Sequence, residues 1–142
     1  MYIKEIKSKI TLKTIHYIIK FSEDGLATNE RKNVISSENF LQLSIMKFPH
    51  GKTFKPHKHI YKNLNSEIIA QESWIVLKGS ARVIFYDIDG TFLQEEILNT
   101  LDSSITLEGG HNYEIMEHDS IIYEYKSGPY LGQALDKEFI DD

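Results

Sequence analysis

"HGKTFKPHKHIYK", residues 50–62, holds three of the six histidines of the chain, and two of them flank a single lysine. In an extended strand, residues two positions apart point to the same face. His57 and His59 would then project together, while Lys58 points the other way. Pro56 cannot donate a ladder hydrogen bond, so the stretch is expected at a strand start or a sheet edge. Two arms of a metal site fit this pattern, and a solvated basic loop is the alternative.

The composition indicates one ordinary globular domain. The 142 residues are 41% hydrophobic and 26% charged, with a net charge of −5 and no cysteine. Disulfides, zinc–thiolate sites and thiol nucleophiles are therefore excluded, and an acidic chain is unsuited to nucleic acid. No apolar stretch of about 18 residues suggests a membrane span. The start, MYIKEIKSKITLK, lacks the features of a secretory signal, so we expect a cytoplasmic protein without a membrane partner.

Short segments rich in Ile, Val, Phe and Tyr recur along the chain between turn signals, which is typical of an all-β sandwich or barrel. The expected strands are 10–21, 40–48, 73–78, 81–87, 92–98 and 120–126. The expected turns include 23–25, 79–80, 87–90, 102–104, 109–110 and 117–119. The polar residues 24–39 are expected to form a loop, and 135–142 a short helix or a loosely ordered tail.

The alternation of apolar and polar residues along the strands gives a first indication of which sheet faces are buried. In 120–126, Ile121, Tyr123 and Tyr125 share one face, and Glu124 and Lys126 lie on the other. In 81–87, by contrast, both faces are partly apolar, which indicates a sheet covered on each side by a second sheet or by a neighbouring subunit.

The glycines around the histidine pair extend the pattern to a known family. Five residues separate Gly51 from His57, and six separate Glu72 from Gly79 in ESWIVLKG. Gly-x5-His-x-His and Glu-x6-Gly are the two halves of the first cupin motif, so the chain resembles the cupin superfamily. The resemblance implies a small jelly-roll barrel, the double-stranded β-helix, which often holds one metal ion.

The gap between the two halves departs from the family pattern. Twelve residues separate His59 from Glu72, where the family usually has three or four. An insertion in a loop at the barrel mouth is tolerable, but it leaves Glu67 as a rival carboxylate. Glu72 is favoured because it alone has the motif's distance to Gly79.

A second cupin motif would supply a third histidine from a later strand. His111 follows Gly109-Gly110 in ITLEGGHNYEI, although Leu107 stands where the motif has proline and the glycine-to-histidine spacing is one residue short. The resemblance therefore implies one divalent transition metal, Zn, Fe, Mn or Ni, with four ligands: His57, His59, Glu72 and His111. The other histidines are assigned to no metal: His16, His50 and His118.

The C-terminal segment carries a narrower resemblance. YEYKSGPYLGQALDKEF, residues 123–139, is similar to the closing segment of the WbuC-type cupins, which are encoded among surface-polysaccharide genes. The likeness covers roughly 40–138 and implies a metal-binding protein linked to sugar or nucleotide-sugar metabolism. Pro129 after a glycine forces a turn, which carries Tyr130 towards whatever lies beside it. Lys126 and Tyr130 are the candidate substrate-binding residues. A tyrosine that only anchors the strand is the alternative for Tyr130.

The resemblance also implies how the whole chain is divided. It implies a single cupin domain over 1–142, with an N-terminal strand and loop extension (1–39), a barrel core (40–130) and a C-terminal tail (131–142). Homodimers that exchange an N-terminal strand are common in the superfamily, and residues 1–20 suit that role.

Three functions remain open at this point. The first is a metal-dependent enzyme acting on a small polar substrate. The second is a metal-independent sugar-nucleotide isomerase or epimerase with a histidine base and a tyrosine acid. The third is a non-catalytic sugar- or metal-binding module. Nucleophile-elbow, phosphate-loop and dinucleotide motifs are absent from the sequence, and the fold alone does not choose among the three.

Overall fold

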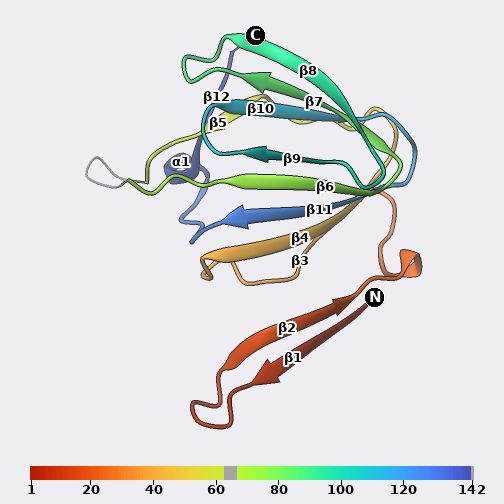
Figure 1. Cartoon of the computed structure of the whole chain (residues 1–142), viewed down its shortest axis with the longest axis vertical. Helices are drawn as coiled ribbons and strands as arrows, with labels where there is room; N and C mark the ends of the chain where they lie inside the picture. Colours follow the sequence, from red (N-terminus) through yellow and green to blue (C-terminus); the bar gives the residue numbers. More distant parts are fainter. Residues whose placement is uncertain (63–66, 142) are drawn as a thin grey trace.

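The computed structural model describes residues 1–62 and 67–141 and is almost entirely β-structure (Figure 1). Its strands and short helices follow in this order: β1 Tyr2–Lys7, β2 Thr14–Lys20, η1 Glu23–Gly25, β3 Glu30–Asn33, β4 Leu41–Phe48, β5 His57–His59, β6 Glu72–Lys78, β7 Ser80–Tyr86, β8 Phe92–Asn99, β9 Ser103–Thr106, β10 Gly110–Ile115, β11 Ser120–Ser127, α1 Gln133–Asp136 and β12 Lys137–Phe139. The all-β expectation is confirmed. Within these described ranges, no helix is long and apolar enough to cross a membrane.

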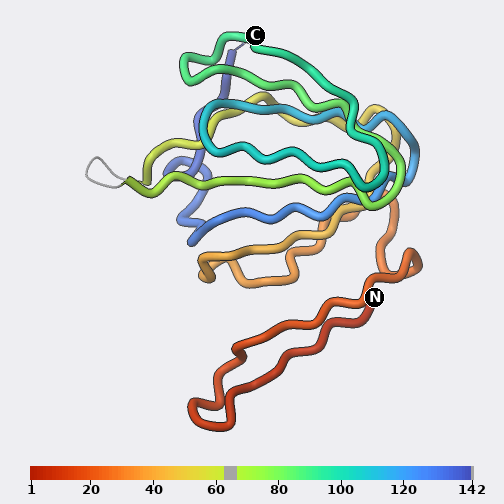
Figure 2. Tube along the Cα trace, in the orientation of Figure 1, coloured from red at the N-terminus to blue at the C-terminus, as the bar shows by residue number. Residues whose placement is uncertain are grey.

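Two five-stranded sheets form the barrel, in the orders β12-β5-β10-β7-β8 and β3-β4-β11-β6-β9. The neighbours within each barrel sheet are antiparallel. Figure 2 shows how the chain passes back and forth between the two sheets. Buried side chains from both sheets meet in one apolar core, as expected for a jelly roll.

The inward-facing positions change from polar to apolar along the barrel. They are Glu72, Trp74 and Val76 along β6, Lys126, Glu124 and Ile122 along β11, and His111, Tyr113 and Ile115 along β10. Each fully buried aliphatic side chain at the apolar end contributes about 1.5–3 kcal/mol of transfer free energy. The indole of Trp74 stacks on Tyr113 with centroids 3.8 Å apart and planes 4° apart, and this stack separates the core from the polar end. The polar end is therefore free to form a site.

The two motif glycines adopt backbone conformations that side chains disfavour. Gly51 has φ +77° and Gly79 has φ +79°, both in the left-handed region. A Cβ on Gly79 would also lie 2.2 Å from the hydroxyl of Ser120. The Gly51 amide donates to the carbonyl of Ile115 at 2.8 Å, which ties the loop before β5 to the end of β10. The glycines thus place β5 and β6 in the barrel.

The N-terminal extension is a hairpin. Among the described strands, β1 and β2 pair only with each other, and Figure 1 shows them (red) standing away from the barrel. The single strand expected over 10–21 is wrong at its start, because residues 8–13 form the turn. The hydroxyl of Ser8 accepts the amides of Ile10 and Thr11, each at 3.1 Å, and Leu12 has φ +60°. Such local side-chain bonds compete with strand pairing.

Two segments expected to be irregular are strands. β3 lies inside the polar stretch 24–39 and pairs with β4. β9 begins at Ser103, inside the expected turn 102–104, and pairs with β6. Both are four-residue edge strands with mostly polar sequences, and three residues of β3 and two of β9 are exposed.

The C-terminal tail is only partly as expected. The short helix is present as α1, but residues 137–139 continue as β12 instead of a loose end. β12 pairs with β5, and the amide of Ile140 donates to the carbonyl of Pro56 at 3.0 Å. The tail therefore borders the strand that carries the histidine pair.

Candidate metal centre

The structure brings together the four residues named by the cupin motifs. One ligand atom from each lies within 4.8 Å of all the others. Three of these residues are buried, and the fourth, His57, is half-buried: His57 and His59 on β5, Glu72 at the start of β6, and His111 on β10.

The remaining candidates lie outside this group. Glu67, the rival carboxylate, is exposed and does not belong to the four-residue group. His16, His50 and His118 are also outside it, and the side chain of His118 is 67% exposed. The long insertion therefore leaves Glu72, and not Glu67, beside the histidines.

Hydrogen bonds orient two of the imidazoles. The Nδ1–H of His57 donates to the carbonyl of Lys55 at 3.1 Å, which leaves Nε2 as the atom with a free lone pair. Nδ1 of His111 lies 2.8 Å from the hydroxyl of Thr106. Burial lowers the pKa of both histidines to about 4, and for His57 the neighbouring His111 adds to the effect. Both imidazoles are therefore neutral near neutral pH.

Glu72 lies between two histidines. Its Oε2 is 3.3 Å from Nε2 of His59, and its Oε1 is 3.4 Å from Nε2 of His111. The indole N–H of Trp74 donates to Oε1 at 3.0 Å. Burial alone would raise the pKa of Glu72, but His111 and His59 outweigh it and hold the pKa well below its ordinary value. Glu72 is thus ionised.

The donor set fits a divalent transition metal. Three imidazoles and one carboxylate are suitable ligands for Zn, Fe, Mn or Ni, and the open side towards the pocket leaves room for water or a ligand. Nε2 of His111 is buried and has no hydrogen-bond partner among the described residues, although it faces Glu72. Buried polar atoms are rarely left unsatisfied, and coordination of an ion would satisfy this nitrogen. The group could therefore hold a metal.

A buried carboxylate from the tail stands behind His59. Oδ2 of Asp136 lies 3.3 Å from Nδ1 of His59 and 2.5 Å from Nζ of Lys126. Nζ of Lys62, near the start of the insertion that follows His59, lies 3.6 Å from Oδ1 of Asp136. Partners of this kind orient a ligating imidazole. Sequence reasoning missed Asp136, which entered only as part of the segment 123–139 that carries the narrower family resemblance.

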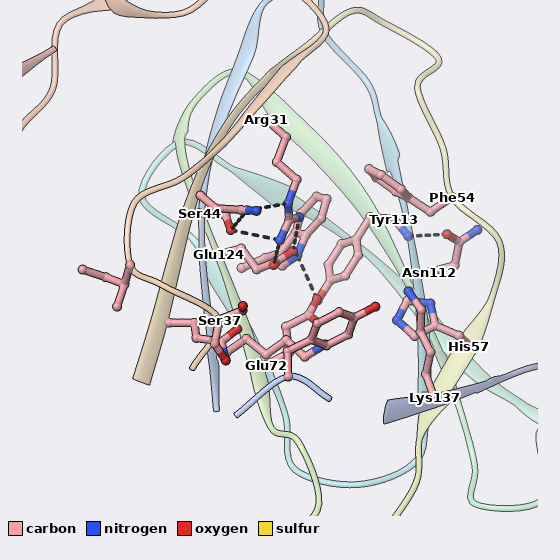
Figure 3. A pocket seen from close by; sticks show the side chains of 16 residues that line it. Arg31, Ser37, Ser44, Phe54, His57, Glu72, Asn112, Tyr113, Glu124 and Lys137 are labelled. Carbon is pink, nitrogen blue, oxygen red and sulfur yellow. Dashed lines mark hydrogen bonds and ion pairs between the residues drawn. The ribbon is translucent and has the colours of Figure 1, made fainter. Parts of the chain in front are cut away.

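A cavity of about 340 Å³ opens beside the group, and Figure 3 shows His57 and Glu72 at its wall. Lys126 and Tyr130, the candidate substrate-binding residues, both line it. Nζ of Lys126 lies 5.2 Å from the ring centroid of Tyr130. Lys137 of β12 lines the same cavity.

A second charge pair, between the exposed Arg31 and the buried Glu124, lines the cavity. The Arg31 guanidinium donates to both carboxylate oxygens of Glu124, at 3.0 and 2.5 Å (Figure 3). The indole N–H of Trp74 also donates to Glu124, at 3.1 Å. Burial and the nearby Glu72 raise the pKa of Glu124. Neither Arg31 nor Glu124 was expected in the site, because Arg31 lies in the presumed loop and the polar face of β11 points into the barrel.

Comparison with solved structures identifies the fold. The capsular polysaccharide assembling protein CapF from Staphylococcus aureus is similar over 79% of this chain, with a TM-score of 0.64 and 17% identity. KdgF from Halomonas sp. is similar over 68% of this chain and 76% of its own, with a TM-score of 0.51 and 20% identity. A Klebsiella pneumoniae protein with a double-stranded β-helix domain is similar over 87% of this chain and 97% of its own, with a TM-score of 0.58 and 15% identity.

The chain spans only 32% of the CapF chain. No protein-family model matches the sequence, and no curated protein matches it. The structural likeness and the strand order together establish the double-stranded β-helix, the cupin fold, for this chain.

Proposed function

We propose that this chain is a metal-binding cupin that binds or acts on a small polar metabolite, a sugar or nucleotide-sugar, in surface-polysaccharide metabolism. The observation that carries the proposal is the four-residue group with an unsatisfied buried Nε2, beside a cavity of suitable size. A cytoplasmic location remains our expectation from the sequence.

In this proposal His57, His59, Glu72 and His111 hold one divalent ion, which would polarise a ligand oxygen as a Lewis acid. The lowered pKa values of His57 and His111 keep their lone pairs available. Asp136 holds His59 in orientation, and Lys126 and Tyr130 contact the ligand at the cavity wall.

The solved relatives support the choice of ligand class. CapF is described as a capsular polysaccharide assembling protein, and one of its structures contains the inhibitor 3-isopropenyl-tropolone. These statements concern CapF. They favour a small-molecule role on this fold and agree with the WbuC-type segment in the sequence.

A metal-independent isomerase or epimerase is less well supported. It requires a tyrosine acid beside a histidine base. Tyr113 is the tyrosine in ring contact with His111, at 5.2 Å between centroids. Burial raises the pKa of Tyr113, and its hydroxyl lies 2.9 Å from that of Ser104, behind the stacked Trp74. Tyr113 is therefore a poor proton donor to a ligand. Tyr130 also lines the cavity, but among the described residues its ring contacts Lys126 and no histidine. A non-catalytic binding module is consistent with the same geometry.

Elemental analysis of untagged protein tests the proposal. We expect about one equivalent of a divalent transition metal per chain, and its loss in His57→Ala, His111→Ala and Glu72→Gln. Glu67→Gln and His118→Ala are matched controls that should keep the metal, because both residues lie outside the group. Metal retained in the first three variants, or lost in Glu67→Gln alone, would refute the assignment.

A further inference from the structure

Lys137 points to the same side of its sheet as the histidine pair. In the register of β12 against β5, Lys137 lies opposite His59 and Phe139 opposite His57. Directly paired residues share a face of an antiparallel sheet. Glu138, between them, faces outward instead, where it lies 3.8 Å from Nζ of Lys58. Lys137 therefore lines the cavity as a consequence of strand register (Figure 3).

Lys137 differs from the other two cations of the cavity in having no carboxylate partner. Arg31 is paired with Glu124, and Lys126 with Asp136. In residues 1–62 and 67–141, no carboxylate lies within ion-pair distance of Lys137, and its Nζ lies 5.9 Å from the ring centroid of Phe139. Burial, followed by repulsion from Lys126, lowers the pKa of Lys137 and outweighs the more distant attraction of Glu72, Asp136 and Glu124, so its site is unfavourable for a positive charge.

We infer that Lys137 binds an anionic group, carboxylate or phosphate, of a small polar ligand whose remaining oxygens face His57 and Glu72. This inference rests on the proposed function and specifies its ligand class. A partner anion would pair with Lys137, which has no ion-pair partner among the described residues, and would offset its repulsion with Lys126. The cavity, about 340 Å³, lies at the lower end of the range for ligand sites, which suits one monosaccharide unit.

Calorimetric titration of the zinc-loaded, full-length chain tests this inference with three matched sugars: D-glucuronate, D-glucose 6-phosphate and D-glucose. We expect at least one of the two anions to bind about tenfold or more tightly than glucose. The tighter anion identifies the group as carboxylate or phosphate. In Lys137→Gln the preference should fall by about tenfold to hundredfold, the range for a hydrogen bond to a charged group. Lys137→Arg should retain it.

Lys58→Gln is the matched control, because Lys58 lies on the adjacent strand and faces outward. It should bind the anions like the unmodified chain. Equal binding of all three sugars, no binding of either anion at millimolar concentration, or an anion preference unchanged in Lys137→Gln would overturn the inference.

Zinc content is measured separately for each variant, and the titrations are repeated on metal-free protein. An anion preference that depends on Lys137 but persists in a chain that takes up no zinc would support this inference while refuting the metal proposal. Full zinc loading with an anion preference that does not depend on Lys137 would support the metal proposal and refute this inference.

Discussion

His59 has an environment different from that of the other two histidines in the group. Carboxylates lie 3.3 Å from each of its ring nitrogens, Glu72 at Nε2 and Asp136 at Nδ1. Burial lowers its pKa, but the hydrogen-bonding influence of Asp136 and Glu72 outweighs burial and the net pKa is raised above 6.5. His57 and His111, by contrast, have pKa values of about 4.

This difference predicts how metal affinity depends on pH. Between about pH 4 and 6.5 the metal-free site carries a proton on His59, while His57 and His111 are already neutral. Metal binding must therefore release one proton, so the logarithm of the affinity should rise with pH with a slope of about one. Below pH 4 the other two imidazoles also bind protons, and the slope should steepen.

Competition with a chromophoric chelator between pH 4.5 and 6.5 measures this slope. Asp136→Asn removes one of the two carboxylates that raise the pKa of His59, so the one-proton region should shift to lower pH. A slope near three over the whole interval would contradict the lowered pKa values of His57 and His111.

At the residue scale, the sequence predicts those parts of the site that are encoded locally. His57 and His59 share a strand face, and glycine spacing locates Glu72 as the partner carboxylate. The Arg31–Glu124 pair joins positions 93 residues apart, and no local pattern specifies such a contact. Asp136 likewise reaches His59 only because the tail returns to β5.

At the element scale, length and position in the sheet decide what can be predicted. β6, β7 and β11 have seven or eight residues and sit inside their sheets, so their hydrophobic patterns are long enough to recognise. β3, β9 and β12 have three or four residues at sheet edges. An edge strand has a neighbouring strand on one side only and faces solvent on the other, so a polar sequence there does not exclude a strand.

β11 shows that alternation alone does not tell which face is inside. Ile121, Tyr123 and Tyr125 share the outer face of the barrel sheet, and Tyr123 packs edge-on against Phe21 at 6.5 Å. The face with Glu124 and Lys126 points into the site. In most strands the more polar face is exposed to solvent, but in β11 the polar face lines the cavity because it supplies residues to the site.

At the scale of the whole molecule, the β1–β2 hairpin lacks cover. It stands off the barrel, and its Ile15 and Ile18 are 56% and 41% exposed. An isolated two-stranded hairpin is marginally stable in water. We therefore propose that a second copy of the chain covers it, as the expected homodimer with an exchanged N-terminal segment.

Light scattering coupled to size-exclusion chromatography tests the dimer. The full chain should have twice the mass of one chain, and deletion of residues 1–20 should give a monomer that still folds, because the barrel core does not include the hairpin. A full chain that stays monomeric at high concentration contradicts the proposal. A dimer that survives the deletion would instead place the interface on a barrel face.

The stack of Trp74 on Tyr113 has an optical consequence. Trp74 is the only tryptophan in the sequence, and its indole N–H donates to both Glu72 and Glu124, at 3.0 and 3.1 Å. An ion that draws charge from Glu72 changes the electric field at the indole, so intrinsic fluorescence should report metal occupancy. Zinc should shift the emission, and paramagnetic Mn²⁺ should quench it, with the same midpoint as metal uptake; His111→Ala should show neither effect. Complete metal uptake with unchanged emission would place the ion away from Glu72.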